Sequence, residues 1–125
     1  MTWQELIDKY YPEGSRLRDI YLKHCRSVAD LALRINTTRK LSLDEADVEE
    51  AAMLHDIGIC LCDAPGIECH GSEPYIRHGV LGAELLRKEG FPERDALVAE
   101  RHTGAGLTRD DIESQHLPLL SLIHI

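Results

Sequence analysis

Aromatic residues are scarce in this 125-residue sequence, because phenylalanine, tryptophan and tyrosine together make up only 5% of it. Long apolar runs with bulky aromatics, which are typical of a β-sandwich, are missing too. No stretch comes near the about 20 consecutive apolar residues that a membrane-spanning helix needs. We therefore expect neither a sandwich nor a membrane protein. The length suits one domain over residues 1–125.

An excess of basic charge is missing as well. The chain has 14 basic and 22 acidic residues and a net charge of −8. Extended DNA or RNA binding depends on basic surface that releases counterions, so we do not expect it here. The negative net charge is still compatible with a small phosphorylated substrate, because a metal ion and one or two arginines are enough to bind it. The opening MTWQELIDKYYPEG does not resemble a cleavable signal, so we expect a cytoplasmic protein with reduced cysteines.

Helix signals recur along the chain and predict an all-α fold of five or six helices. Thr2 with Glu5 and Ser42 with Glu45 each match a capping box at a helix start. Apolar residues over 17–36 recur at helical spacing and predict a long helix.

Breaks between the predicted helices are also readable. Gly58 is placed to end the helix that begins after Ser42, as the residue that follows a helix C-terminus. Pro74 and Pro92 stand near the starts of two further helices, and Gly90 ends the first of these. Residues 60–73 have turn chemistry without a clear period, so we expect a long functional loop there.

Four of the seven histidines occupy positions at which helices can bring them together, namely His24, His55, His78 and His102. Read singly, His24 and His102 match hydrogen-bonded core histidines more often than ligands. His55 stands beside Asp56, and neighbours on a helix point about 100° apart, so both rarely face one solid core. Both can reach an ion near the helix end, and the ion removes the cost of burying an uncompensated carboxylate. Imidazole with carboxylate suits Mn, Fe, Co, Ni or Zn.

The pattern as a whole resembles a known family. An upstream His24, the HDIG motif at 55–58, His78 in IRHGVLGAELL and His102 in AERHTGAGLT are similar to the HD-domain superfamily of metal-dependent phosphohydrolases. The sequence resembles in particular the small bacterial HDIG-domain proteins, over about residues 17–117. The resemblance implies an all-helical HD-domain bundle.

The resemblance also implies a ligand set for a divalent transition metal. His24, His55 and Asp56 match the primary ligands, which in the family are completed by a late aspartate. His78 and His102 match the positions that hold a second metal in some members. One or two ions are therefore expected.

The activity implied is hydrolysis of a small phosphoester, such as a nucleotide, by metal-activated water. Asp56 would be the catalytic residue that holds both metal and water. Arg77 and Arg101 adjoin proposed ligands and are candidates for substrate binding through phosphate oxygens. Taken individually, each is better explained as a solvated arginine on a helix surface. Many relatives carry a lysine soon after the motif glycine, where Ile59 and Cys60 stand here.

The C-terminal part departs from the family pattern. Asp110 and Asp111 lie too early for the late aspartate, in a short helix predicted after Thr108, and Thr103 replaces a frequent further histidine. Residues 118–125 form an atypical tail. We expect a truncated chain that lacks the last core helix or helices, and a natural short variant is the alternative.

Several alternatives stay open on sequence alone. A degenerate, non-catalytic HD domain would bind a nucleotide or a protein partner. An oxygenase with a diiron centre or a helical scaffold with structural histidines would use the same residues differently. A further alternative is a short zinc clip, whose ligands would be Cys60, Cys62, Cys69 and His70. Adjacent cysteine and histidine are awkward to place in one tetrahedral site. The sequence does not indicate an oligomeric state.

Overall fold

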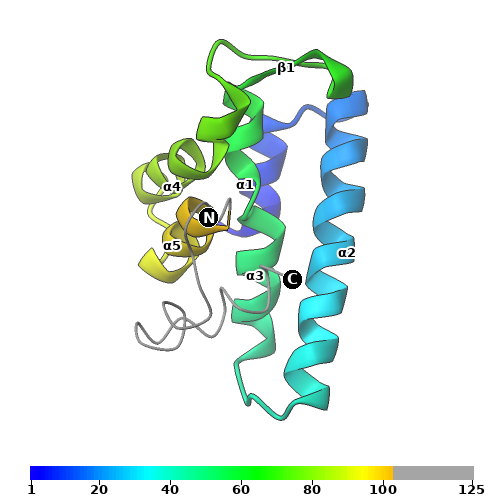
Figure 1. The fold of residues 1–125 in the computed structure, drawn as a ribbon, viewed down its shortest axis with the longest axis vertical. Helices are drawn as coiled ribbons and strands as arrows, with labels where there is room; N and C mark the ends of the chain where they lie inside the picture. Colours follow the sequence, from blue (N-terminus) through cyan, green and yellow to red (C-terminus); the bar gives the residue numbers. More distant parts are fainter. Residues whose placement is uncertain (103–125) are drawn as a thin grey trace.

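Five α-helices dominate residues 1–102, the part of the chain that the computed structural model describes (Figure 1). This confirms the all-α prediction. The helices are α1 (Trp3–Tyr10), α2 (Arg16–Thr38), α3 (Glu45–Leu54), α4 (His78–Lys88) and α5 (Glu93–Arg101). Three 3₁₀ helices join them, η1 (Ile57–Leu61), η2 (Pro65–Ile67) and η3 (Tyr75–Arg77).

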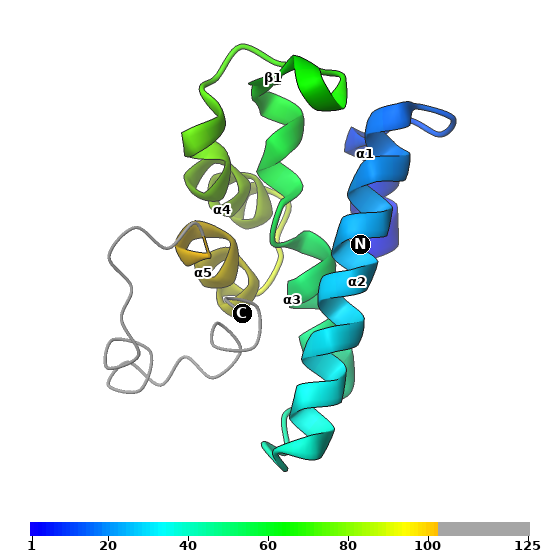
Figure 2. The ribbon, with the colours of Figure 1, turned by 45° about the vertical axis from the view of Figure 1, so that its right-hand side comes forward.

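The helix α3 lies at the centre of the arrangement. It has the long helix α2 on one side and the packed pair α4 and α5 on the other, as both views show (Figures 1 and 2). Contacts with α1 cover a further side of α3, and η1 packs against α4. The core accordingly collects its largest buried side chains from α1, α3, η1 and α4, among them Leu6, Met53, Leu54, Ile57 and Leu86.

One of the two predicted capping boxes is confirmed. The Glu5 backbone N–H donates to the Thr2 hydroxyl at 3.2 Å, and the Thr2 backbone N–H donates to the Glu5 carboxylate at 3.1 Å. The capping box predicted at Ser42 is wrong, because Ser42 lies outside the helix and has a φ of +58°. The helix α3 starts two residues later, where the Asp44 carboxylate accepts from the Asp47 N–H at 3.0 Å.

The turn between α2 and α3 explains this shift. The Asn36 side-chain amide donates to the Leu43 carbonyl at 2.9 Å and accepts from the Leu43 N–H at 3.0 Å. This pair of bonds fixes Leu43 against the end of α2, so the backbone enters α3 only after Leu43. Sequence spacing cannot reveal such a bond because it joins two elements.

The predicted role of Gly58 as a helix terminator is also wrong. The helix α3 ends at Leu54, Gly58 lies inside η1, and its φ is not positive. A Cβ at Gly58 would collide with the His78 carbonyl oxygen and with the backbone of Gly82. The glycine therefore serves a close crossing of η1 and α4. Gly90, in contrast, follows α4 at a φ of +83°, as predicted.

The predicted loop at 60–73 contains a small antiparallel sheet of β1 (Asp63–Ala64) and β2 (Cys69–His70). Pro74 precedes η3, so α4 itself begins only at His78, whereas Pro92 directly precedes α5 as predicted.

None of the helices in residues 1–102 combines the length and hydrophobicity needed to cross a membrane. The short helix predicted after Thr108, the late-aspartate candidates Asp110 and Asp111, Thr103 and the tail at 118–125 all lie outside the described residues. The single-domain boundary and the truncation stay predictions.

Candidate metal centre

His55 and Asp56 lie at a break in the helical path. The helix α3 ends one residue before His55, and η1 begins one residue after Asp56, whose φ is −104° and ψ is 13°. Both residues are almost fully buried, with 4% and 5% of their surface exposed. A buried carboxylate without partners is costly, so the surroundings of Asp56 decide what this position does.

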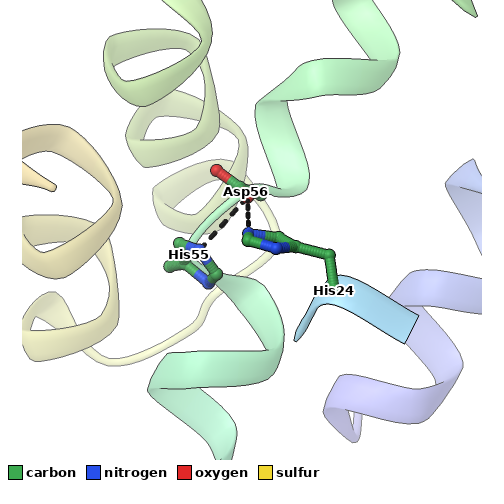
Figure 3. Close-up of side chains that lie close together, drawn as sticks. All are labelled: His24, His55 and Asp56. Carbon is green, nitrogen blue, oxygen red and sulfur yellow. Dashed lines mark ion pairs between the residues drawn. The ribbon is translucent and has the colours of Figure 1, made fainter. Parts of the chain in front are cut away.

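Four imidazoles surround the Asp56 carboxylate. Its Oδ2 atom lies 2.9 Å from His24 Nε2 and 3.1 Å from His55 Nε2 (Figure 3). Its Oδ1 atom lies 2.8 Å from His102 Nε2 and 3.3 Å from His78 Nε2. The four rings come from α2, the end of α3, the start of α4 and the end of α5. The fold thus brings together all five residues that the sequence singled out as metal ligands.

The backbone fixes the orientation of three of these rings. The Nδ1 atoms of His55, His78 and His102 each lie 2.5–2.7 Å from the carbonyl oxygen three residues earlier. A carbonyl only accepts a hydrogen bond, so each Nδ1 carries the ring hydrogen. In the neutral ring, the Nε2 atom that points at Asp56 therefore presents a lone pair. This is the form in which histidine binds a metal.

These lone pairs need a positive charge between them. His78 Nε2 lies 3.1 Å from His102 Nε2, and both face an oxygen of Asp56. Acceptors at such distances repel each other unless protons or a cation lie among them. Metal–nitrogen bonds of about 2.1 Å place neighbouring ligand atoms about 3.0 Å apart in an octahedron and about 3.4 Å apart in a tetrahedron, which is close to the separations here. The donor set therefore fits a divalent transition metal.

The ligand atoms form two groups that share one residue. Asp56 belongs to the first group with His24 and His55 and to the second with His78 and His102. Within each group, the ligand atoms lie within 4.8 Å of one another. The arrangement offers one carboxylate oxygen to each group, which suits either one ion or two ions bridged by Asp56.

The charges of the centre agree with this arrangement. Burial alone would raise the pKa of Asp56. With protons rather than a cation between the groups, hydrogen bonds from the protonated Nε2 atoms of the four histidines outweigh burial and hold that pKa well below its usual range. The hydrogen bond to Asp56 in turn raises the pKa of His24. Asp56 is thus an ionised carboxylate that attracts positive charge into a buried position.

The two arginines proposed for the substrate lie beside the centre in sequence. Arg77 is the last residue of η3, and its exposed guanidinium pairs with the Glu73 carboxylate at 3.2 Å. Arg101 is the last residue of α5, next to His102. Their contacts with a phosphate stay predictions.

The zinc clip considered from the sequence has no support. The Cys60 and Cys69 thiols lie 3.3 Å and 2.9 Å from the carbonyl oxygens of Ile57 and Ile59. Within residues 1–102, the groups able to hold a metal consist only of the four histidines and Asp56.

Sequence reasoning missed Tyr75. Its carbonyl oxygen accepts the Nδ1–H bond of His78, and its ring lies beside the His78 ring at a tilt of 34°, with the centroids 4.5 Å apart. The signal available in the sequence was that Tyr75 stands three residues before His78, the spacing at which a backbone carbonyl can accept a hydrogen bond from the ring of a histidine.

The model of the HD-domain family matches residues 21–121. The chain belongs to the HD-domain family. The His55–Asp56 doublet opens the HDIG motif on which the resemblance depends, and both residues lie at the centre of the site. No solved structure matches this HD domain.

Three relatives share part of their sequence with this chain. An uncharacterized protein of Methanocaldococcus jannaschii is 40% identical over 100 residues, which cover 78% of this chain and 53% of that protein. A tRNA (cytidine(56)-2'-O)-methyltransferase of Thermoplasma volcanium is 33% identical over 115 residues, or 92% of this chain and 30% of that protein. The enzyme of the same name from Picrophilus torridus is 31% identical over 101 residues, or 81% and 26%. The chain thus spans about half of the first relative and less of the others.

Proposed function

We propose that this HD domain is a metal-dependent phosphohydrolase that acts on a small phosphoester such as a nucleotide. The observation that supports this most directly is the convergence of four imidazole Nε2 atoms on the two oxygens of Asp56. When bound there, a divalent metal lowers the pKa of water and screens the negative charge of phosphoryl oxygens.

The residues of the chain have separate tasks in this proposal. His24 and His55 hold one side of the centre, and His78 and His102 hold the other. Asp56 holds both sides and accepts a hydrogen bond from the attacking water, which it orients toward phosphorus. The backbone carbonyls behind three of the rings keep the Nε2 atoms aimed inward without substrate, so little reorganisation is needed on binding.

Arg77 and Arg101 are proposed to bind phosphate oxygens. Each adjoins a histidine of the second group, so its guanidinium can approach a phosphoryl group held at the centre. Arg77 would exchange its exposed Glu73 partner for phosphate, which costs little because an exposed ion pair contributes at most about 1 kcal/mol.

A small substrate is favoured over a nucleic acid. Two relatives are named as tRNA methyltransferases, so a role of the HD domain beside an RNA-modifying activity is a second candidate. The net charge of −8 argues against tRNA binding by this segment itself, because phosphate backbones require basic surface. Filter binding of tRNA at low and high salt would test this candidate.

Metal binding is the first test of the proposed function. We expect manganese to bind the wild-type chain and Asp56→Asn to weaken it at least about tenfold, the loss seen for an outer-shell partner alone. His24→Ala and His78→Ala should each impair only one ligand group. His70→Ala is the matched control, because His70 is exposed on β2 and outside both groups. Metal content after dialysis and titration calorimetry measure these effects.

Turnover of p-nitrophenyl phosphate and its diester by the manganese-loaded chain is the second test. Hydrolysis that disappears in Asp56→Asn and persists in His70→Ala supports catalysis at this centre. Tight metal binding without hydrolysis would instead identify a non-catalytic HD domain. Hydrolysis that survives Asp56→Asn would exclude the proposed site.

A further inference from the structure

A pocket of about 180 Å³ adjoins the candidate metal centre. His24 and Asp56 form part of its wall, so a group in the pocket lies directly beside the first ligand group. The rest of the wall is apolar or tyrosine, and it consists of Leu17, Ile20, Tyr21, Ile59, Ile67 and Tyr75. The pocket is therefore continuous with the proposed reaction centre and differs from it in polarity.

The helix α2 fixes this pocket relative to the metal ligands. Ile20, Tyr21 and His24 lie three, four and seven residues after Leu17, which places all four on one face of the helix. On the opposite side, the segment around η2 reaches the first half of α2 (Figures 1 and 2), with which it is in contact. A ligand histidine and an apolar wall thus belong to the same rigid element.

The lining determines which groups fit. Among the described residues that line the pocket there is no lysine or arginine. A second phosphate or another charged group placed there would lose water without gaining a partner of opposite charge, which is costly. An apolar group gains from burial instead. A dry apolar cavity of about 150 Å³ holds one benzene molecule, so this pocket has room for a single aromatic ring.

We propose that the pocket binds an uncharged aromatic group of a phosphomonoester whose phosphoryl group lies at Asp56. This substrate class rests on the proposed phosphohydrolase function. In the reaction, the oxygen of water forms a new bond to phosphorus and the ester P–O bond breaks. The proton released by water passes to the departing oxygen, so the products are inorganic phosphate and an aromatic alcohol.

Two phosphonates, which cannot be hydrolysed, measure this pocket without relying on activity. Benzylphosphonate and ethylphosphonate carry the same charge and differ in the aromatic ring. We expect benzylphosphonate to bind the manganese-loaded full chain at least about tenfold more tightly, the lower end of the gain from one methylene in an apolar pocket. Ile20→Asn should reduce this ratio at least fivefold, and Ile67→Asn, from another element, should act in the same direction. Leu31→Asn should leave it unchanged, because Leu31 is 40% exposed on the same helix and not part of the pocket.

Equal affinities of the two phosphonates would overturn the proposal, as would a ratio that neither pocket variant changes in folded protein. Circular dichroism verifies folding of both variants. Phosphate release from benzyl phosphate and ethyl phosphate distinguishes a failure of the pocket proposal from a failure of the proposed phosphohydrolase function. Tighter benzylphosphonate binding without hydrolysis keeps the pocket and rejects the phosphohydrolase. Hydrolysis of both esters with equal kcat/KM keeps the phosphohydrolase and rejects the pocket.

Discussion

The crossing of η1 and α4 at Gly58 should be one of the least tolerant positions in the chain. A Cβ at Gly58 would lie 2.5 Å from the Gly82 nitrogen and 2.9 Å from the Gly82 Cα, and it would also collide with the His78 carbonyl oxygen. All three atoms belong to the backbone of α4, so no side-chain rotation relieves the contact. Gly58→Ala can be accommodated only if η1 and α4 move apart.

The magnitude follows from the kind of contact. Overpacking of a core costs about 1–3 kcal/mol, and we expect Gly58→Ala to cost at least about 3 kcal/mol because backbone must shift. Gly82→Ala is milder, since its Cβ would lie 3.1 Å from the Gly58 nitrogen and 3.4 Å from an Ile57 methyl, and we expect about 1 kcal/mol. Gly66→Ala is the matched control, because nothing lies within 4 Å of its Cβ and its φ is not positive. It should be neutral or stabilise by about 0.4–1 kcal/mol.

Urea unfolding followed by circular dichroism measures all three glycine variants under one condition. Because the His78 carbonyl takes part in the collision, Gly58→Ala should also displace the His78 ring and weaken manganese binding in the fraction that folds. The reasoning is refuted if Gly58→Ala and Gly66→Ala unfold within about 1 kcal/mol of each other, a difference within the spread of ordinary surface substitutions.

Two further substitutions test buried polar groups that are not themselves candidate ligands. Burial, together with neighbouring Glu50, raises the pKa of Asp95 to about 8, so the folded chain keeps a proton that the unfolded chain releases above about pH 4. The stability contributed by this proton is complete below about pH 4 and is lost as the pH rises to about 8, by up to about 1.4 kcal/mol per pH unit. Asp95→Asn should therefore reduce the loss of urea stability between pH 5 and 8, and an unchanged loss would contradict this assignment. The buried Tyr11 hydroxyl donates to the Ile57 carbonyl at 2.9 Å and accepts from the Cys60 N–H at 3.1 Å, so Tyr11→Phe should lower the free energy of unfolding by about 1–3 kcal/mol, which a wild-type urea midpoint would refute.

Local signals predicted the helices well because helix formation is itself local. The long helix expected over 17–36 extends over Arg16–Thr38, and Pro92 and Gly90 mark the boundaries predicted from them. The candidate ligands were selected by a different signal. The resemblance to the HD-domain pattern pointed to four histidines and Asp56, which the fold brings together, and their binding of a metal stays a prediction.

Contacts between distant segments could not be predicted in the same way. Gly58 and Gly82 are 24 positions apart in the sequence. Only the packing of η1 against α4 shows that a Cβ at either position would approach the backbone of the other. The small sheet between Asp63 and His70 pairs segments too short to show a strand period. The pocket likewise depends on Ile67 reaching α2, which no spacing in the sequence encodes.

The break between α3 and η1 is what makes adjacent ligands possible. In a continuous helix, His55 and Asp56 would point about 100° apart. At the break, the His55 Nε2 and Asp56 Oδ2 atoms come within 3.1 Å, while η1 turns away to pack against α4. Tyr11, at the end of α1, stabilises this turn through its hydrogen bonds to Ile57 and Cys60, and its hydroxyl lies 3.4 Å from the Asp56 carbonyl oxygen. The geometry of the centre is therefore set by packing around η1 as much as by the ligands, and residues that never touch a metal should control how well one binds.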